Sequence, residues 1–452
     1  MSFMSVLDSH IFGPLFNDDE ISGLFSDAAY VRALVDVEVA LALAQARVGV
    51  IPASAGFAIA KAQAEKIDLA SLSRGTSRSG FPIIALTEQL RHQVSSDAAP
   101  YVHWGATTQD VMDTACVLQL RTAANVTRAR ITEIIRALSA LAAKHRSTIL
   151  AARTHGQQAL PTTFGLKVAA WLSPLVRHSE RLNELLPRML VVQLGGAAGT
   201  LASLGDKGLL VSAEFAKELG LGSAVMPWHA QRDSLVEFAG WLSLVTGSLA
   251  KMAQDIILMA QTEIGEAGES GEAGRGGSST MPQKSNPISS ELIIAAARTN
   301  ASLLASVHHA QIQEHERATH GWQMEWLALP QMVMLTGGAL KHAAYLACNL
   351  QVDGAAMRAN MQNGHDLILA EAAVFALAKA MPRMQAEELV KRACAAAVAD
   401  NKALIGVVEM MAAGSVPSGS VDWQSLARPE NYLGATQSMI DDVLERAEKF
   451  RR

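Results

Sequence analysis

Apolar residues recur at spacings of three and four along extended parts of the chain, a pattern typical of amphipathic helices. Between Ala106 and His155 the sequence contains neither glycine nor proline, and most of this interval is predicted to form one helix. At about 1.5 Å per residue, a helix of about 35 residues would be roughly 50 Å long, well beyond the usual three or four turns. Comparable patterns predict further long helices over residues 162–190, 229–264, 287–316 and 323–350.

Several of these predicted helices are apolar on more than one face, as the crowded apolar residues between Leu242 and Met259 illustrate. Such a helix is surrounded by other helices, and a bundle shared between subunits would satisfy it. Strand signals are few, alanine-rich stretches recur, and only 5% of the residues are aromatic. The sequence therefore predicts an all-α fold built on a central bundle of long helices.

Polar and glycine-rich segments interrupt the helical pattern, and they suggest where domains begin and end. Loops are predicted at residues 72–83, 95–109, 194–208 and 265–287, and shorter helices follow residue 355. We therefore expect an N-terminal helical domain over 1–111, a central long-helix domain over 112–355 and a small C-terminal helical domain over 356–452.

The composition and charge of the chain indicate which kinds of binding partner to expect. The chain has a net charge of -5, which gives no reason to expect a nucleic-acid or anionic-membrane partner. The start of the chain has no basic segment followed by an apolar core, and no apolar stretch of about 18 residues lacks both charges and glycines. The three cysteines are far apart, which favours reduced core residues. We expect a soluble cytoplasmic protein, in which an anionic substrate would need a locally cationic pocket.

The segment at residues 276–287 (GGSSTMPQKSNP) carries the strongest chemical signal in the sequence. Its glycines let the backbone approach a ligand. Ser278 and Ser279 offer hydroxyl groups, Lys284 offers a positive charge, and Asn286 offers a donor and an acceptor. These groups are suited to closing over a small anion and moving a proton at a carbon beside a carboxylate. The alternative is an ordinary Ser/Gly loop that precedes a helix.

Two other polar segments have a similar character. In residues 103–110 (HWGATTQD), Thr107 and Thr108 stand where the first long helix begins, and exposed amides and the helix dipole favour anions there. These threonines could equally serve only as a helix cap. In residues 153–165, His155 is a candidate proton carrier near neutral pH, although a loop histidine can also be merely exposed.

Metal and dinucleotide sites have weaker support. His315 and His320 are five residues apart, so on a helix they point in different directions and do not form the pair of ligands found in helical zinc motifs. The glycine-rich stretch at residues 195–199 follows a predicted helix rather than a strand. We expect neither a metal nor an organic cofactor.

The three polar segments, in this order and in a chain of long helices, resemble the fumarase/aspartase superfamily of homotetrameric lyases. The resemblance covers most of the chain, and the 276–287 signature is highly specific. It implies that loops from three subunits meet at each active site, and that the substrate loses or gains a proton beside a carboxylate. It also implies catalytic roles for Ser278 in proton transfer, for His155 as partner acid or base, and for Lys284 and Asn286 in stabilising the aci-carboxylate. The residues expected to bind substrate are His103, Thr107, Thr108, Thr154, Ser279 and Arg317.

The sequence departs systematically from the adenylosuccinate lyase type of this superfamily. Residues 78–83 (RSGFPI) replace a Thr-x-His-Asp-Val stretch. Arg317 is kept, but Trp322 and Trp326 stand where that type has a serine and an arginine that help to hold a nucleotide phosphate. Because a phosphate would lose charge-assisted hydrogen bonds there, a nucleotide substrate is disfavoured.

Trp228-His229, the signature segment and residues 429–434 (PENYLG) are instead similar to the bacterial branch that lactonises 3-carboxy-cis,cis-muconate during protocatechuate breakdown. This resemblance implies a small tricarboxylate substrate and no cofactor. Two alternatives remain: a fumarate-eliminating lyase of the adenylosuccinate type, and a non-catalytic structural protein on the same scaffold, as in lens crystallins.

Overall fold

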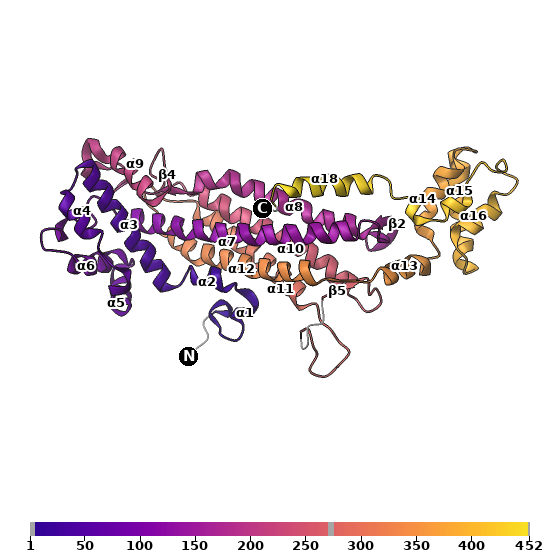
Figure 1. Cartoon of the computed structure of the whole chain (residues 1–452), viewed down its shortest axis with the longest axis horizontal. Helices are drawn as coiled ribbons and strands as arrows, with labels where there is room; N and C mark the ends of the chain where they lie inside the picture. Colours follow the sequence, from indigo (N-terminus) through magenta and orange to yellow (C-terminus); the bar gives the residue numbers. More distant parts are fainter. Residues whose placement is uncertain (1–4, 270–274, 451–452) are drawn as a thin grey trace. The chain divides into compact units, whose positions relative to one another are not determined.

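A computed structural model describes residues 5–269 and 275–450, so residues 270–274 of the loop predicted at 265–287 lie outside it. The fold is mostly helical, as the sequence predicts (Figure 1). The chain divides into two compact units. Unit 1 contains the described residues up to Ile131, together with His178–Gly247 and Ala295–Lys341; unit 2 contains Thr132–Arg177, Ser248–Ile294 and the described residues from His342. The division into three domains stays a prediction.

Long helices form the centre of the fold, close to the predicted ranges. They are α7 (Thr108–Lys144), α8 (Phe164–Met189), α10 (Asp233–Met259), α11 (Ile288–Ala310) and α12 (Gly321–Asn349), and each belongs partly to both units. In unit 1, the indole nitrogen of Trp241 on α10 donates to the carbonyl of His178 on α8, at 2.9 Å. In unit 2, Trp171 on α8 donates to Asp255 on α10, at 2.7 Å. Indole groups therefore tie α8 and α10 together in each unit.

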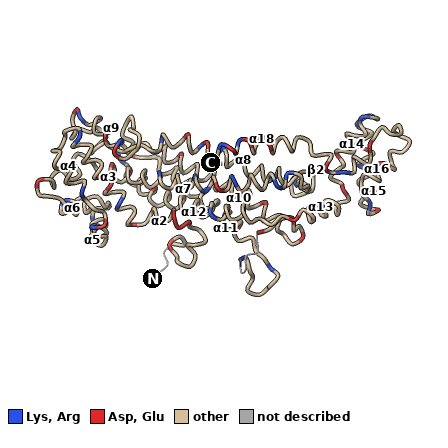
Figure 2. The backbone as a smooth tube through the Cα atoms, viewed as in Figure 1, with Lys and Arg blue, Asp and Glu red and all other residues tan. Residues whose placement is uncertain are grey.

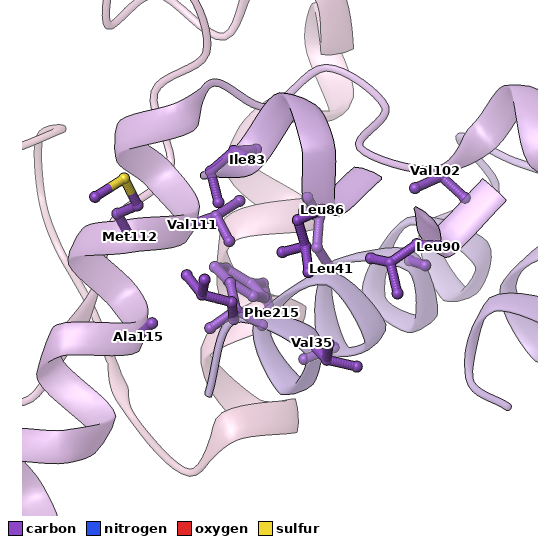
Figure 3. Close-up of a cluster of buried hydrophobic side chains, with 14 of the residues drawn as sticks. Val35, Leu41, Ile83, Leu86, Leu90, Val102, Val111, Met112, Ala115 and Phe215 are labelled. Carbon is purple, nitrogen blue, oxygen red and sulfur yellow. The ribbon is translucent and has the colours of Figure 1, made fainter. Parts of the chain in front are cut away.

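The rest of unit 1 consists of short helices and a two-stranded sheet, several of which pack around α3. Its elements are the 3-10 helices Val6–Asp8, Ala64–Lys66, Ala99–Tyr101 and Ala202–Lys207, the helices α1 (Gly13–Phe16), α2 (Asp19–Gly23), α3 (Asp27–Val48), α4 (Ala53–Ile59), α5 (Leu69–Ser79), α6 (Ile83–Gln93) and α9 (Gly208–Leu219), and the parallel strands β3 (Val191–Val192) and β4 (Gly222–Ser223). Figure 3 shows their shared core, where Leu41 of α3, Leu86 of α6 and Phe215 of α9 are fully buried beside the first turns of α7. This core fixes where α7 begins.

The prediction of a loop at residues 72–83 is wrong, because helix α5 covers most of it. The Asp68 carboxylate caps the start of α5 by accepting the amide of Ala70 at 2.9 Å, and Gly80 ends the helix with a φ of 83°. Gly75 lets α5 pack tightly on α6, since a Cβ there would lie 2.4 Å from the Cβ of Ala85. Gly75, which suggests a loop in the sequence, serves here at a close contact between two helices.

Unit 2 contains a hairpin and a group of short C-terminal helices. Strands β1 (Ile149–Thr154) and β2 (Gln157–Thr163) pair antiparallel, as do β5 (Ala267–Gly268) and β6 (Gln351–Val352). The remaining elements are α13 (Gly354–Asn363), α14 (Ala370–Leu377), α15 (Arg383–Ala399), α16 (Leu404–Ala412), α17 (Trp423–Leu426), α18 (Thr436–Glu448) and the 3-10 helices Leu367–Leu369 and Pro429–Asn431. Buried side chains of β1, α13, α14, α15 and α16 form a second core.

Helix α10 is long and apolar enough to cross a membrane by length and composition alone. In the fold some of its side chains are part of the core: Phe238 and Trp241 are buried and stack on each other, with ring centroids 5.6 Å apart. Glu237 of the same helix pairs with Arg188 of α8. Basic and acidic residues are interspersed along the chain (Figure 2), in keeping with its small net charge.

Candidate active site

A histidine–carboxylate pair attaches the loop that precedes α7 in unit 1 to helix α3. His103 has a φ of 64°, and its Nδ1 lies 2.6 Å from Oε1 of Glu38, a buried side chain of α3. Burial by itself would lower the pKa of His103, but the Glu38 carboxylate outweighs burial and the pKa is raised above its ordinary value. The shift is toward the charged form of His103, the form that would attract an anion.

Asp110, in the first turn of α7, organises the same loop. Its buried carboxylate accepts the amides of Thr107, Gly195 and Gly196 at 2.9–3.0 Å, and its Oδ1 lies 2.7 Å from Nε2 of His229. The bond to Thr107 is the return half of a capping box. Because Asp110 accepts the amides of Gly195 and Gly196, the segment at 195–199 is an internal carboxylate cradle.

Arg317 completes this network from the segment before α12. Its guanidinium donates to Oγ1 of Thr107 at 3.1 Å and to the carbonyls of Gly196 and Ala197 at 3.3 and 3.0 Å. Thr108, the first residue of α7, is partly buried beside them. The structure thus brings together Thr107 and Arg317, both expected to bind substrate, at a helix N-terminus that favours anions.

Thr154 and His155 lie at the tip of the β1–β2 hairpin in unit 2, where the sequence predicted a plain loop. His155 and Gly156 have φ values of 50° and 77°, and the flanking residues Thr154 and Gln157 pair across the strands. Positive φ at both central positions is the geometry of a type I′ turn, which suits the right-handed twist of a hairpin. Both Thr154 and His155 are exposed, so the turn presents the imidazole outward from a rigid support.

Arg153 anchors the base of this turn. It forms a two-bond pair with Glu266, at 2.8 and 2.6 Å, and the Glu266 side chain is completely buried. Asn360 of α13 donates to the same carboxylate at 3.0 Å. A bidentate arginine–carboxylate pair is geometrically specific, so the hairpin has a fixed attachment within unit 2.

The signature loop is an exposed segment with a closed neck. Gly276 accepts both the backbone amide and the side-chain amide of Asn286 at its carbonyl, at 2.9 and 3.1 Å, and Gly277 pairs with Ser285 in an isolated bridge. Gly276 has a φ of 70°, and a Cβ there would lie 2.5 Å from the carbonyl oxygen of Asn286. Asn286 therefore has a structural role in closing the loop, in addition to the catalytic role predicted for it.

Ser278 occupies the chemically distinctive position in this loop. Its Oγ accepts the backbone amides of Thr280 and Met281, at 3.3 and 3.1 Å. Two amides that point at a hydroxyl oxygen stabilise negative charge on it, as a proton-transferring serine needs. Ser279 and Lys284 are exposed.

The segments on either side of the loop are tied to α11 and α12. The Glu269 carboxylate accepts the amides of Ser289 and Ser290 in the first turn of α11, at 3.1 and 2.8 Å. The guanidinium of Arg275 lies over the ring of Tyr345 on α12, 3.7 Å from its centroid, and donates to Oγ of Ser289. The loop thus leaves and rejoins the helices at fixed points.

The departures noted in the sequence at Phe81, Trp322 and Trp326 meet in space within unit 1. The rings of Phe81 and Trp322 stack 5.5 Å apart, and Trp326 lies edge-on to both, at 6.0 and 4.9 Å. We call these three residues the aromatic corner. The indole nitrogen of Trp322 also donates to the buried carboxylate of Asp113, at 3.0 Å.

Sequence reasoning missed Asp110, Glu38 and Glu269 as organisers of the site. The Thr107-x-x-Asp110 spacing of a capping box could have indicated Asp110. The two glutamates leave no comparable signal in the sequence. Glu38 contacts His103, 65 residues away, and Glu269 contacts Ser289 and Ser290 on the far side of the signature loop. Among the residues that the structure describes, no cluster of three or more histidine, cysteine or acidic side chains could hold a metal ion.

Comparison with known proteins identifies the family of the chain. Residues 16–299 match a family model described as lyase. The chain is 42% identical over 445 residues to the 3-carboxy-cis,cis-muconate cycloisomerase of Acinetobacter baylyi, covering 97% of this chain and 99% of that protein. It is also 38% identical to trans-aconitate decarboxylase 1 of Mycosarcoma maydis, covering 96% and 88%.

Among solved structures, the 3-carboxy-cis,cis-muconate lactonizing enzyme of Pseudomonas putida is 39% identical and has a TM-score of 0.91, covering 98% of this chain and 100% of that one. The matched family model covers more than half of the chain, and the relatives align along nearly its whole length. The chain therefore belongs to the lyase family of the fumarase/aspartase superfamily.

Proposed function

We propose that this enzyme is a cycloisomerase that converts 3-carboxy-cis,cis-muconate into 4-carboxymuconolactone in the breakdown of protocatechuate. The observation that carries the proposal is 42% identity over 97% of the chain to a named cycloisomerase. The site chemistry is compatible with it, because Ser278 has an amide-supported hydroxyl and Arg317 lies at the N-terminal end of α7.

The reaction joins an oxygen of one substrate carboxylate to an alkene carbon. The alkene electrons move toward another carboxylate, which becomes an aci-anion, and a proton is then delivered to the adjacent carbon. Stabilising that transient charge supplies the largest share of rate enhancement in such reactions. Lys284 and Asn286, with Thr107 and Thr108, have the donors for this role.

Ser278 delivers the proton in the forward direction in our proposal and removes it in reverse. The amides of Thr280 and Met281 support the alkoxide that remains, and Lys284 in the same loop adds positive charge. His155 is the alternative proton donor, since imidazole side chains commonly serve as general acids and bases. No metal or organic cofactor is required.

Substrate recognition uses cations around the remaining carboxylates. Arg317, His103 and His155 take this role, helped by Thr154 and by the exposed hydroxyl of Ser279. Folding the muconate so that its own carboxylate faces the alkene gives the rate advantage of an intramolecular reaction.

We further propose a cytoplasmic homotetramer in which each active site takes its loops from different subunits. Two features support this: the hairpin tip that carries His155 is exposed, and most of the signature loop is exposed. Sedimentation of the purified protein tests the assembly, and a monomer with full activity would contradict it.

A decarboxylase of an unsaturated tricarboxylate is a second candidate. It is favoured by 38% identity over 96% of the chain to trans-aconitate decarboxylase 1. An adenylosuccinate-type lyase is less well supported, because the aromatic corner occupies positions where phosphate donors would be needed.

Three substrates offered in parallel separate these functions: 3-carboxymuconate, trans-aconitate and adenylosuccinate. Loss of the conjugated-diene ultraviolet absorbance together with lactone formation supports the cycloisomerase. Release of carbon dioxide from trans-aconitate supports the decarboxylase. Turnover of adenylosuccinate alone, or of none of the three, would overturn the cycloisomerase proposal.

A further inference from the structure

Unit 1 contains a cavity of about 790 Å³ whose lining includes Met112 and Asp113 in the first turns of α7. Trp322, Trp326 and Leu329 of α12 line one side, Leu72 and Thr76 of α5 another, and Tyr30 of α3 a third. The cavity is large for a small tricarboxylate alone, since drug-sized ligands occupy pockets of about 300–1,000 Å³.

The charged groups that line this cavity argue against an anion inside it. Its only lining cation among the described residues is Arg232, which is 1% exposed. Its Nε and Nη2 donate to Glu325 at 2.8 and 2.5 Å, and its Nη1 and Nη2 donate to Asp113 at 2.7 and 3.0 Å. Arg232 is therefore committed to these two carboxylates, while Asp8 and Asp27 add further negative charge to the lining.

The aromatic corner supplies what an uncharged ligand needs. Trp326 is 37% exposed, so its indole face is available, whereas Trp322 is 3% exposed and held by Asp113. Aromatic faces favour planar apolar groups through stacking and edge contacts. The cavity and the anion-binding end share elements, because Asp113 lies on α7 one turn after Asp110, and Trp322 follows Arg317 by five residues.

We propose that this cavity receives an uncharged apolar arm of the substrate, so that the enzyme accepts unsaturated polycarboxylates that carry a hydrocarbon substituent and rejects those that carry a phosphorylated one. The carboxylates stay at the α7 end and the arm lies against Trp326. This inference rests on the proposed function for the reaction and adds the substrate range.

Turnover tests the inference first. The purified enzyme is offered 3-carboxymuconate and an analogue bearing a phenyl group on the carbon chain, and kcat/KM is measured for wild type, Trp326→Ala and Trp326→Phe. One lost aromatic contact should lower kcat/KM for the phenyl analogue about tenfold in Trp326→Ala. The parent substrate should change by less than about threefold, and Trp326→Phe should recover most of the loss. Equal losses for both substrates would overturn the inference.

The matched control is Trp423→Ala in unit 2, which removes an indole that does not line the cavity. This variant should leave kcat/KM unchanged for both 3-carboxymuconate and the phenyl analogue. A loss specific to the phenyl analogue in this control would also overturn the inference, because the selectivity would then arise elsewhere.

If the enzyme does not turn over 3-carboxymuconate, the proposed function is wrong but the inference about the cavity can still be tested. A direct binding measurement provides that test. Quenching of tryptophan fluorescence by 2-naphthol is compared with quenching by 2-naphthyl phosphate. 2-Naphthol should bind at least about tenfold more tightly than the phosphate ester and should lose about tenfold in affinity in Trp326→Ala. Equal or tighter binding of the phosphate ester, or unchanged binding of 2-naphthol in the variant, would contradict the inference.

Discussion

Asp110 and Arg317 hold the same two residues, Thr107 and Gly196, through different atoms. Asp110 accepts their backbone amides, while Arg317 donates to the hydroxyl of Thr107 and to the carbonyl of Gly196. The position of the α7 end is thus set by a carboxylate that faces inward and a cation that reaches the same loop from the α12 side.

Replacing Asp110 should therefore disturb substrate binding through its neighbours. We expect Asp110→Asn to raise KM for 3-carboxymuconate more than it lowers kcat, because an amide cannot accept all of the bonds that the carboxylate accepts. Loss of buried charge-assisted bonds should also destabilise the fold by about 1–3 kcal/mol. The exposed Asp97→Asn serves as the control, and unchanged KM in Asp110→Asn would contradict this positioning role.

Ser278→Ala should lower turnover at least about a hundredfold while the circular dichroism spectrum and melting temperature stay unchanged, because general acid–base groups contribute about 10²–10⁴-fold. Ser285→Ala, an exposed serine of the same loop, is the matched control. Near-normal turnover in Ser278→Ala would assign proton delivery to His155.

The neck of the signature loop can be tested separately from its chemistry. Gly276→Ala places a Cβ 2.5 Å from the Asn286 carbonyl oxygen, so the neck must open and activity should fall at least about tenfold. Gly265→Ala controls for backbone strain, since Gly265 also has a positive φ of 60° but has nothing within 4 Å of the added atom. Equal losses in the two variants would mean that strain, rather than the closed neck, matters.

The pair of His103 and Glu38 makes stability depend on pH. Because the pKa of His103 is raised in the fold, the pair stabilises fully below the unfolded-state pKa of about 6.5 and loses that contribution as pH rises through the folded-state value. The difference in unfolding free energy between wild type and His103→Gln should therefore be larger at pH 6 than at pH 9. Urea denaturation at both pH values measures it, and the opposite order would refute the assignment.

Arg232 should be indispensable to unit 1. Its removal leaves Asp113 and Glu325 buried without their cation, so Arg232→Leu should cost about 3–5 kcal/mol of stability. Arg383→Ala breaks an exposed pair with Glu387 and should cost less than about 1 kcal/mol. Similar costs for the two variants would show that the buried network is not required.

The sequence predicts the long helices well because their apolar periodicity is sustained over many turns, as in α7. It fails at α5, where Gly75 allows a tight contact with Ala85 that only the tertiary fold reveals. It also fails to predict the hairpin behind His155, since a short two-stranded element has little periodicity to detect. The signature loop follows directly from its motif.

Within the site, the motif residues were predictable but their supports were not. Ser278 and Arg317 are recognisable by type and spacing. Glu38 and Glu269 support the site through contacts with residues that are distant in the sequence. The pattern of a single sequence does not reveal such contacts. The three domains and the catalytic roles of individual residues remain predictions.

The cradle at Gly195 and Gly196 has one more consequence. A glycine-rich turn of this kind would otherwise attract phosphate or sulfate from the medium, but here α7 inserts its own counter-ion through Asp110. The carboxylate of Asp110 takes the place of a dissolved anion at this turn. The conformation of the turn should therefore be the same in phosphate, in sulfate and in a buffer without oxyanions.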